Sequence, residues 1–465
     1  MRDKFIRMTT EPVRSLVLKM AAPTTAMMLV SAVYNIADTY FVGRLGTSAT
    51  AAIGVSFSLM ALIQAIGFLF GHGAGNYISR ELGAKRRDNA DKMAATGFLT
   101  TLIVGAALAL PGLAFLRPLA IALGSTPTIL PHAMDYLFFI LIAAPWMAAS
   151  FALNNLLRFQ GSAVYGMLGM ASGAVLNLML DPLFIFVFDM GVGGAGLATM
   201  ISQMAGFSLL LYGCTRPGNI RIRLGNFAPS RGAYKEIMAG GFPSLCRQGL
   251  ASIAAIVLNH AAAAFGDAAV AAIAIVQRIG MFAGSALIGF GQGFQPVCGF
   301  NFGAGLYSRV REAFYFCVRS ASVALLVIAA CGYVYAAEIV ALFRDGDPAV
   351  IEIGTLALRF ECFTFPLMGW VILNNMMLQT IGRAVRASVL ALARQGLFLM
   401  PVLFLLTPGF GILGIQLAQP FANFATFLLS LPLGIGVLRE MKEQDAGKAN
   451  LDESALEEQA AAWEA

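Results

Sequence analysis

Apolar stretches dominate the chain, and they recur at a length that suits a membrane rather than a soluble core. Each is long enough to cross a bilayer as a helix, which takes about 20 residues. Short segments with most of the charged residues separate them. We therefore expect an all-α membrane protein with twelve transmembrane helices, at roughly 16–42, 50–75, 93–116, 133–157, 163–188, 193–214, 236–264, 269–297, 313–337, 353–378, 386–406 and 411–437.

The sign of the charge alternates from one connecting segment to the next. Arg and Lys gather in the N-terminal segment, at 85–92 and at 216–235, whereas Asp189, Asp267 and Glu338 lie in segments between them. Since short loops rich in Lys and Arg stay in the cytoplasm, we expect a multi-pass protein of the cell membrane with both termini cytoplasmic. The Ala- and Glu-rich tail is expected to be a solvated helix or disordered.

The second half of the chain repeats the first. LGTSATAAIG at 45–54 aligns with FGDAAVAAIA at 265–274, and Pro23 aligns with Pro243, both at an offset of 220 residues. A constant offset across the apolar runs indicates a duplication. We predict an N-terminal six-helix lobe at 1–214, a cytoplasmic linker loop at 215–235, a C-terminal six-helix lobe at 236–438 and a cytoplasmic tail at 439–465.

Six spans return the chain to the side on which it started, so the two lobes share one orientation. They are then related by a pseudo-two-fold axis along the membrane normal, and two such lobes form a cavity at their interface. Rocking one lobe against the other exposes such a cavity to each side in turn. The architecture is therefore typical of a transporter.

Composition excludes several other classes of protein. Hydrophobic residues make up 58% and charged residues 12% of the 465 residues, against roughly 25% charged residues in soluble domains. The net charge of +6 does not indicate a nucleic-acid partner, because the basic residues follow the loop pattern. The six cysteines show no CxxC spacing, and the three histidines are far apart. We therefore expect no cofactor and no enzymatic activity.

The run at 163–188 carries two polar residues within an otherwise apolar sequence. Asn177 and Asp181 are four residues apart, so a helix places them on one face, and Pro182 follows directly. An ionisable group at membrane depth is a functional hypothesis by default, because burying a carboxylate for packing alone is unfavourable. The alternative is an Asp that only hydrogen-bonds a neighbouring helix.

Asp38 and Thr199 of the first half are expected at the same depth as Asn177 and Asp181. Tyr34 and Asp38 are again four apart, near the outer end of the first span, and Thr199 lies early in the sixth. Two carboxylates in a medium of low dielectric constant either share a proton or hold a cation between them. We therefore predict an ion- or proton-coupling site formed by the residues Tyr34, Asp38, Asn177, Asp181 and Thr199. If the site holds a metal ion, we expect Na⁺ at Asp38, Asn177, Asp181 and Thr199.

The second half lacks these acids but contains other polar residues in its spans. Leu258 stands where Asp38 would align, and Val402 falls near the place of Asp181. The polar residues form either a rigid structural network or a contact surface for substrate, and methionines could add an adaptable wall. The candidate cavity residues are Arg247, Gln248, Gln277, Glu361, Arg394, Met27, Met170 and Met204.

Several motifs resemble those of the MATE family, the multidrug and toxic compound extrusion transporters, in particular its DinF-like and MepA-like branches. They are ADTYFVGRLG (37–46), GxGxxNYISRELGAKR (71–86), NNLLRFQG (154–161) and LNLMLDPLFIF (176–186). The resemblance implies a cation or proton site in the N-terminal lobe. The acid of the family's first span falls on Asp38 with Tyr34 one turn before it, and the remaining members fall on Asn177, Asp181 and Thr199. Some branches use acids in the C-terminal lobe, where this sequence has Arg247 and Gln248 in the seventh span.

These observations lead to one expected function and two alternatives. We expect a secondary active antiporter, monomeric in the lipid bilayer, that exports small organic compounds, cationic or amphipathic and drug-like, in exchange for H⁺ or Na⁺. A flippase for lipid-linked precursors is the nearest alternative and would need a strongly cationic cavity. A membrane-embedded enzyme or scaffold is more distant, since the sequence shows no catalytic cluster.

Overall fold

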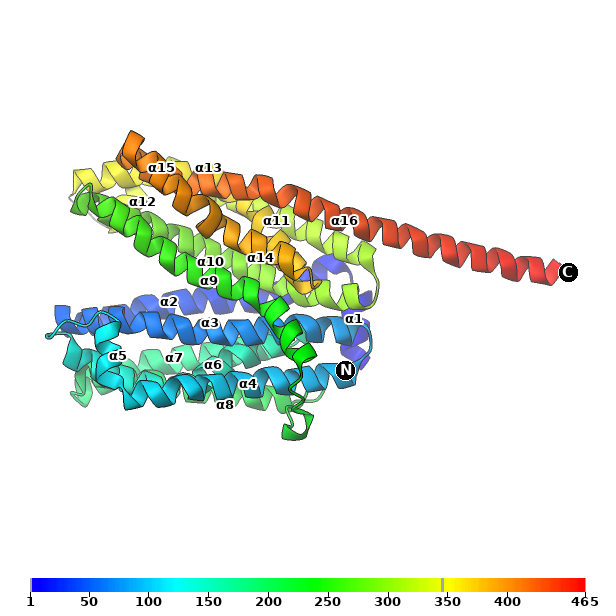
Figure 1. Cartoon of the computed structure of the whole chain (residues 1–465), viewed down its shortest axis with the longest axis horizontal. Coiled ribbons are helices and arrows are strands. Elements are labelled where there is room, and N and C mark those ends of the chain that lie inside the picture. The colour runs from blue at the N-terminus through cyan, green and yellow to red at the C-terminus, as the bar shows by residue number, and fades with distance from the viewer. Residues whose placement is uncertain (1, 344–346, 465) are drawn as a thin grey trace.

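The chain folds almost entirely into helices (Figure 1). The computed structural model describes the backbone of residues 2–343 and 347–464, and all side chains in these ranges except those of residues 2, 32–40, 42, 43, 47 and 448–464. Among the described residues, twelve helical segments are long and apolar enough to cross a membrane. The expected all-α class with twelve spans is confirmed.

The N-terminal lobe begins with a short helix, α1 (Arg2–Thr10), that precedes the first span. Another short helix, α5 (Leu116–Ala122), lies between the third and fourth spans. The fifth span changes from α-helix to a π-helical turn directly after Pro182. The six spans are α2 (Val13–Gly43), α3 (Thr47–Gly83), α4 (Arg87–Ala114), α6 (Leu130–Phe159), α7 (Ala163–Pro182) with the π-helical η1 (Leu183–Val187), and α8 (Gly191–Thr215).

The C-terminal lobe has the same order of elements, including the short helix α12 (Ala336–Phe343). Its eleventh span also contains a π-helical part, which ends just before Pro401. A proline ring clashes with the carbonyl four residues earlier, and this disfavours a regular α-helical turn there. The spans are α9 (Arg231–Ala263), α10 (Asp267–Gly303), α11 (Tyr307–Val334), α13 (Pro348–Thr380), α14 (Ala384–Leu392) with η3 (Ala393–Leu399) and α15 (Met400–Phe410), and α16 (Ile412–Glu464).

The duplication seen in the sequence extends to helix ends and turns. Thr47–Gly83 and Asp267–Gly303 begin and end 220 residues apart, as do Arg87–Ala114 and Tyr307–Val334. The turns before α3 and α10 both contain a glycine with positive φ, Gly46 at 112° and Gly266 at 94°. The two lobes therefore share their local backbone geometry as well as their order of spans.

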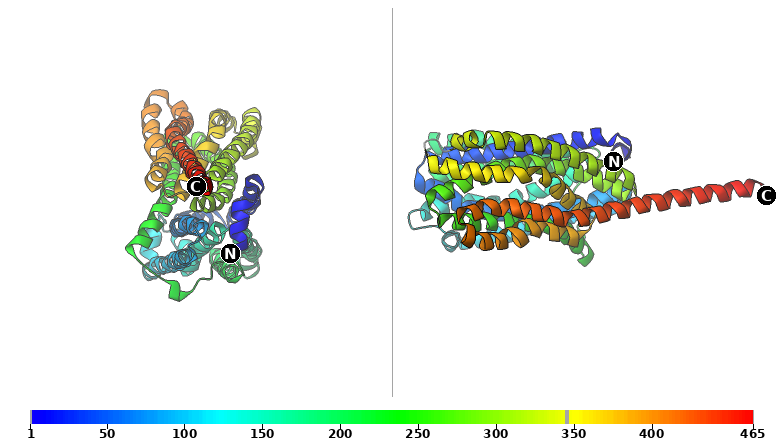
Figure 2. Two further views of the ribbon diagram at one scale, coloured as in Figure 1. Left: turned by 90° about the vertical axis from the view of Figure 1, so that its right-hand side faces the viewer. Right: turned by 90° about the horizontal axis from the view of Figure 1, so that it is seen from above.

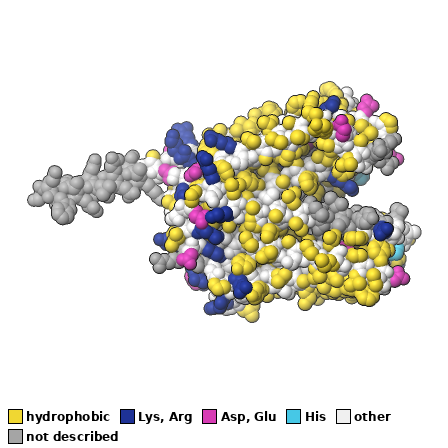
Figure 3. All heavy atoms as spheres, turned by 180° about the vertical axis from the view of Figure 1, so that it is seen from behind, with side chains coloured by type: hydrophobic (Ala, Val, Ile, Leu, Met, Phe, Trp, Pro, Cys, Tyr) yellow, Lys and Arg dark blue, Asp and Glu magenta, His cyan; other side chains and the backbone are white. Residues whose placement is uncertain are grey.

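The two lobes lie side by side, with α2 packed on α10 and α3 on α9 (Figures 1 and 2). Lys and Arg side chains gather at the end of the molecule from which the C-terminal helix projects, called here the basic end (Figure 3). At the opposite end the surface is hollowed between the lobes (Figure 3). The arrangement resembles a V that is closed at the basic end.

Glycines show how closely the lobes approach at the basic end. A Cβ on Gly73 of α3 would overlap the backbone of Ile237 in α9, and one on Gly303 of α10 would overlap the backbone of Arg80 in α3. Toward the other end of these helices, a Cβ on Gly54 would meet no atom within 4 Å. Contact between the lobes therefore concentrates at the basic end.

Two helices extend beyond the expected spans. The segment between α8 and α9 comprises residues 216–230, because Ser230 caps α9 by accepting a hydrogen bond from the backbone N–H of Ala233 at 3.1 Å. Helix α16 continues past residue 437 as one helix to Glu464. The C-terminal tail is thus a helical extension beyond the lobe (Figure 1).

Candidate functional site

Three of the predicted coupling residues meet inside the N-terminal lobe. Asn177, Asp181 and Thr199 have exposed fractions of 1%, 0% and 0%. With its amide nitrogen turned toward Asp181, Asn177 donates to Asp181 Oδ2 at 2.8 Å and accepts from the Thr199 backbone N–H at 3.1 Å. In the opposite orientation Asn177 donates only to Thr199 Oγ1, at 3.3 Å. The first orientation satisfies both ends of the amide.

Small residues bring the two helices of this cluster together. Gly173 of α7 and Gly206 of α8 face each other, and a Cβ on Gly173 would lie 3.1 Å from the backbone oxygen of Ser202. Close approach through glycines is typical of helix pairs in membranes. It allows Asn177 on α7 to reach the backbone of Thr199 on α8.

Tyr34 and Asp38, the remaining predicted coupling residues, lie in the helical backbone of α2, but their side chains lie outside the described residues. Helix α2 packs against α7. The structure thus describes Asn177, Asp181 and Thr199 as a cluster, and the participation of Tyr34 and Asp38 stays a prediction.

The orientation of Asn177 bears on what the cluster can hold. Its NH₂ group faces Asp181, so its carbonyl oxygen points to the Thr199 backbone N–H and away from Asp181 Oδ2. A Na⁺ bound by both side chains would need oxygen atoms from each of them. The turned amide fits a carboxyl group that gains and loses a proton, whereas the opposite orientation directs the Asn177 oxygen toward Asp181, as a bound cation would require.

The C-terminal lobe has a polar cluster of different composition. Glu361 of α13 accepts a hydrogen bond from Asn423 Nδ2 at 3.4 Å, and Asn423 also donates to Thr364 at 3.0 Å. Arg394 of η3 interacts electrostatically with both Glu361 and Arg247. Within the described part of the chain, no ion pair closer than 4.0 Å joins Arg394 to Glu361. Arg247, Glu361 and Arg394 thus form one extended electrostatic network. Both predicted roles, a rigid structural network and a contact surface for substrate, are compatible with it.

Other predicted cavity residues occupy separate places. Gln248 of α9 donates to Gln64 of α3 at 3.5 Å, a contact between the lobes. The Gln277 side-chain nitrogen is buried without a hydrogen-bond partner among the described residues. Met27 is buried, and Met170 packs against the main core.

Met204 differs from these residues. It is 55% exposed, two positions away from both Ser202 and Gly206, which face α7. That spacing turns its side chain to the opposite face of α8. Helix α8 packs on α6 and α7, on the side of the lobe away from the C-terminal lobe (Figure 1). The structure therefore does not support Met204 as part of a cavity between the lobes.

The basic end is closed by a buried arginine of the NNLLRFQG motif, for which the sequence predicted no role. Arg158 of α6 is 1% exposed. Its guanidinium donates across the lobe interface to the Gln292 backbone oxygen at 2.6 Å and to Gln295 Oε1 at 2.9 Å, both in α10. Asn155 Oδ1 accepts a third bond at 2.6 Å. Arg158 therefore joins the two lobes.

Further hydrogen bonds between the lobes surround this contact. Arg80 of α3 donates to the Thr380 backbone oxygen at 2.7 Å and pairs with Glu236 of α9 at 2.9 Å. The Thr380 hydroxyl donates to Asn76 Oδ1 at 2.9 Å. All of these contacts must break if the basic end is to open.

Helix α1 adds a contact across the same end. Lys4 Nζ donates to Ser162 Oγ of the N-terminal lobe at 2.5 Å and to the side chain of Asn219 in the linker. Asn301 of the C-terminal lobe donates to the Met8 backbone oxygen at 3.0 Å. Burial, reinforced by the nearby charge of Arg7, lowers the pKa of Lys4 to about 8. The N-terminal helix is thus bound to both lobes.

One buried histidine was also missed by the sequence analysis. His72 of α3 stacks on Phe68 with ring centroids 5.1 Å apart and contacts the edge of Phe159 at 6.2 Å. Among the described residues, neither of its ring nitrogens has a hydrogen-bond partner. It lies in GHGAG, between glycines that pack against the other helices. Because the sequence places no polar residue beside it, its burial could not be predicted from the sequence pattern.

Comparison with known families identifies this architecture. The sequence model of the MatE family matches two segments of the chain, residues 23–183 and 243–405. This chain belongs to the MatE family. The two MatE segments begin at Pro23 and Pro243, the pair that the internal repeat aligns, so the duplication corresponds to two family units.

Relatives within the MatE family cover most of the chain. The multidrug export protein MepA of Staphylococcus haemolyticus is 30% identical over 389 residues, 83% of this chain and 85% of that protein. MepA of Staphylococcus aureus is 29% identical over 406 residues, 87% and 89% of the two chains. The resemblance to the MepA-like branch is confirmed.

Solved MATE structures share the fold. An outward-facing multidrug resistance MATE transporter of the MOP superfamily superposes with a TM-score of 0.88, at 25% identity over 94% of this chain and 98% of that chain. A MOP superfamily transporter from Pyrococcus furiosus, in which reverse polarity of the binding pocket suggests a different function, matches with the same TM-score, identity and coverage. As a MatE member the chain is a membrane transporter and not an enzyme.

Proposed function

We propose that this protein exports small organic, drug-like compounds in exchange for protons. The relatives named multidrug export proteins support the substrate class. The observation that carries the coupling proposal is the fully buried carboxyl group of Asp181, which accepts a hydrogen bond from the NH₂ of Asn177. That arrangement favours a proton over Na⁺. The Asp38 side chain, one turn after Tyr34 on α2, is the second acid of the proposed site.

The proposed transport cycle starts from the arrangement seen here. A proton that enters from the open end neutralises Asp181 and weakens its bond with Asn177, because a neutral carboxyl is a poorer acceptor. The loss of charge alters the packing of α7 against α2 and favours release of the exported compound. Reorientation then requires the contacts of Arg158 and Arg80 across the basic end to break.

The proposal includes an orientation of the protein in the membrane and a cellular location. The Lys- and Arg-rich end would face the cytoplasm, with both termini on that side, in the cell membrane. The structure then corresponds to an outward-open state. The protein would act as a monomer, because one chain supplies both lobes.

A second candidate rests on arginines within the spans. Arg158 interacts electrostatically with Arg247, and Arg247 with Arg394, while Glu361 is an acid that interacts electrostatically with Arg394. A cationic interior suits an anionic substrate, such as a lipid-linked precursor, and the Pyrococcus furiosus relative is described by reversed pocket polarity. This candidate predicts transport of anionic and not cationic compounds.

Efflux from proteoliposomes tests both candidates. The wild type is loaded with a cationic dye, and pH and Na⁺ gradients are imposed separately. We expect the pH gradient alone to drive dye movement and Asp181→Asn to stop it, with Asp38→Asn equivalent and the double variant no worse, because residues that act as a unit are not additive.

Asp189→Asn is the matched control, since Asp189 is exposed and its φ of 51° is a conformation that Asn adopts readily. If a Na⁺ gradient drives dye movement at constant pH, the coupling ion is Na⁺ and not a proton. Full transport by Asp181→Asn would refute the coupling site. Transport of an anionic probe only would favour the second candidate.

A further inference from the structure

The linker between the lobes lies firmly on the N-terminal lobe. The Ile220 backbone N–H donates to Gln160 Oε1 at 2.7 Å, and the Ile220 side chain is 1% exposed. Asn219 donates to the Gly213 backbone oxygen at 2.7 Å, and the Ala228 backbone N–H donates to Thr96 of α4 at 3.2 Å. The linker backbone is therefore held at both ends.

This attachment directs two arginines to one side. Residues 220–223 alternate between buried or half-buried isoleucines, Ile220 and Ile222, and the exposed Arg221 and Arg223. Arg223 has extended backbone angles, φ −123° and ψ 135°. In an extended segment, residues two apart face the same side. Burial of the isoleucines thus presents Arg221 and Arg223 together.

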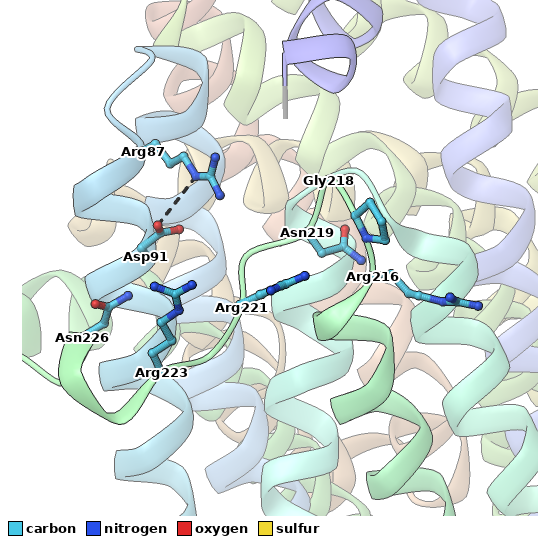
Figure 4. Close-up of a pocket in the computed structure, with 9 residues that line it drawn as sticks. Arg87, Asp91, Arg216, Gly218, Asn219, Arg221, Arg223 and Asn226 are labelled. Atoms are coloured by element: carbon cyan, nitrogen blue, oxygen red, sulfur yellow. Dashed lines mark ion pairs between the residues drawn. The ribbon is translucent and has the colours of Figure 1, made fainter.

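The two arginines line a cavity of about 330 Å³ between the linker and α4 (Figure 4). Its charged residues are Arg87, Arg216, Arg221, Arg223 and Asp91, four positive charges against one negative. Asp91 lies 3.7 Å from Arg87 in an ion pair. Within the described part of the chain, no carboxylate lies within 4.0 Å of the guanidinium groups of Arg216, Arg221 or Arg223. The cavity therefore has an uncompensated positive charge.

The surroundings of the cavity favour a ligand at the membrane surface. Leu224, next to Arg223, is 77% exposed, and Tyr212 is 53% exposed with the Arg216 guanidinium 4.8 Å from its ring centroid. Aromatic and aliphatic side chains beside cations are typical of the interface between bilayer and water. Basic pockets at that level bind anionic headgroups, and planar guanidinium groups match phosphate oxygens.

We propose that this cavity, formed by Arg87, Arg216, Arg221 and Arg223, binds a phosphate group, supplied by an anionic phospholipid headgroup or by free phosphate. The phosphate oxygens accept hydrogen bonds from Arg221 and Arg223 of the linker and from Arg87 of α4. The ligand thereby ties the linker to the N-terminal lobe. This site is separate from the proposed coupling cluster and does not depend on the transport function.

Thermal unfolding of the full-length protein in an uncharged detergent tests the proposal. Three additions are compared at equal ionic strength: phosphatidylglycerol, phosphatidylcholine and inorganic phosphate. We expect phosphatidylglycerol to raise the midpoint of the wild type by several degrees, phosphatidylcholine to have no such effect, and added NaCl to reduce the shift. The Arg221→Gln/Arg223→Gln variant should bind phosphatidylglycerol roughly tenfold more weakly.

Arg231→Gln is the matched control, because Arg231 is an exposed arginine at the start of α9 outside the cavity. It should retain the full shift. If inorganic phosphate matches phosphatidylglycerol at equal phosphate concentration, the ligand is the free anion; if only the lipid acts, it is the headgroup. The single variant Arg221→Gln replaces the double variant if the latter does not fold. Equal shifts in the cavity variant and in Arg231→Gln would overturn the proposal.

Discussion

The two lobes share one backbone plan but place opposite charges on corresponding spans. In the fifth span, Asp181 lies just before the π-helical η1, with a neutral amide and a hydroxyl residue as described neighbours. In the eleventh span, the π-helical η3 carries Arg394, and the nearby acid, Glu361, comes from α13. A proton therefore changes the net charge of the first cluster, whereas the second balances an acid against an arginine. Duplication preserved the framework, and we propose that only the first copy couples transport to protons.

The largest expected effect separates these two acids. Asp181→Asn should lower proton-driven export by roughly a hundredfold or more, because the group that carries the proton is lost. Glu361→Gln should lower it by less than about tenfold, because Arg394 and Asn423 remain to hold the C-terminal cluster. Initial rates of dye efflux in proteoliposomes measure both. Comparable losses in the two variants would show that both lobes couple.

A second prediction concerns the contact that joins the lobes. Arg158→Met should destabilise the closed basic end by about 3 kcal/mol, since three buried hydrogen bonds of a charged group are lost. In a background without the six native cysteines, a cysteine introduced at Ser79, which is buried next to Gly299 of α10, should then react faster with a water-soluble maleimide. Arg359→Met, which removes a half-buried arginine stacked on Tyr333, is the control. An unchanged labelling rate in Arg158→Met would argue against the lock.

The third prediction tests whether Arg394 balances the charge of Glu361 in the C-terminal lobe. Arg394→Met alone leaves Glu361 without its cation and should cost about 2 kcal/mol of unfolding free energy. The double variant Arg394→Met/Glu361→Gln should recover at least half of that loss, because the unbalanced charge is gone. Denaturation in detergent measures the cycle. Additive losses would mean that the two residues act independently.

The smallest effect comes from Lys4. Its pKa falls from 10.5 in the unfolded chain to about 8 in the folded one, so the unfolded state binds more protons between these values. Stability should therefore rise with pH through this window, by about 1 kcal/mol between pH 7 and pH 9. Lys4→Gln should remove this pH dependence. Thermal unfolding of both proteins across that range provides the test, and parallel curves would contradict it.

The sequence was sufficient for the parts of the structure that depend on local pattern. Apolar runs and the offset between Pro23 and Pro243 determine the twelve spans and the duplication. Spacing of four residues placed Asn177 and Asp181 together on α7. The role of Arg158 could not be predicted in this way, because its partners in α10 become neighbours only when the lobes pack together. In sequence it lies next to a turn and resembles a loop cation.

The close glycine contacts at the basic end affect how readily this end of the molecule can open. Gly73 and Gly303 meet backbone rather than side chains of the opposite lobe, so few rotamers must rearrange when these surfaces part. Because backbone lies against backbone, the interface leaves no room for a larger side chain at these two glycines. We expect one methyl group at either position to force the two backbones apart and prevent closure of the basic end, while the core of each lobe stays intact. Such single-methyl variants give direct experimental access to the opposite conformer, for binding studies or for raising conformation-selective antibodies.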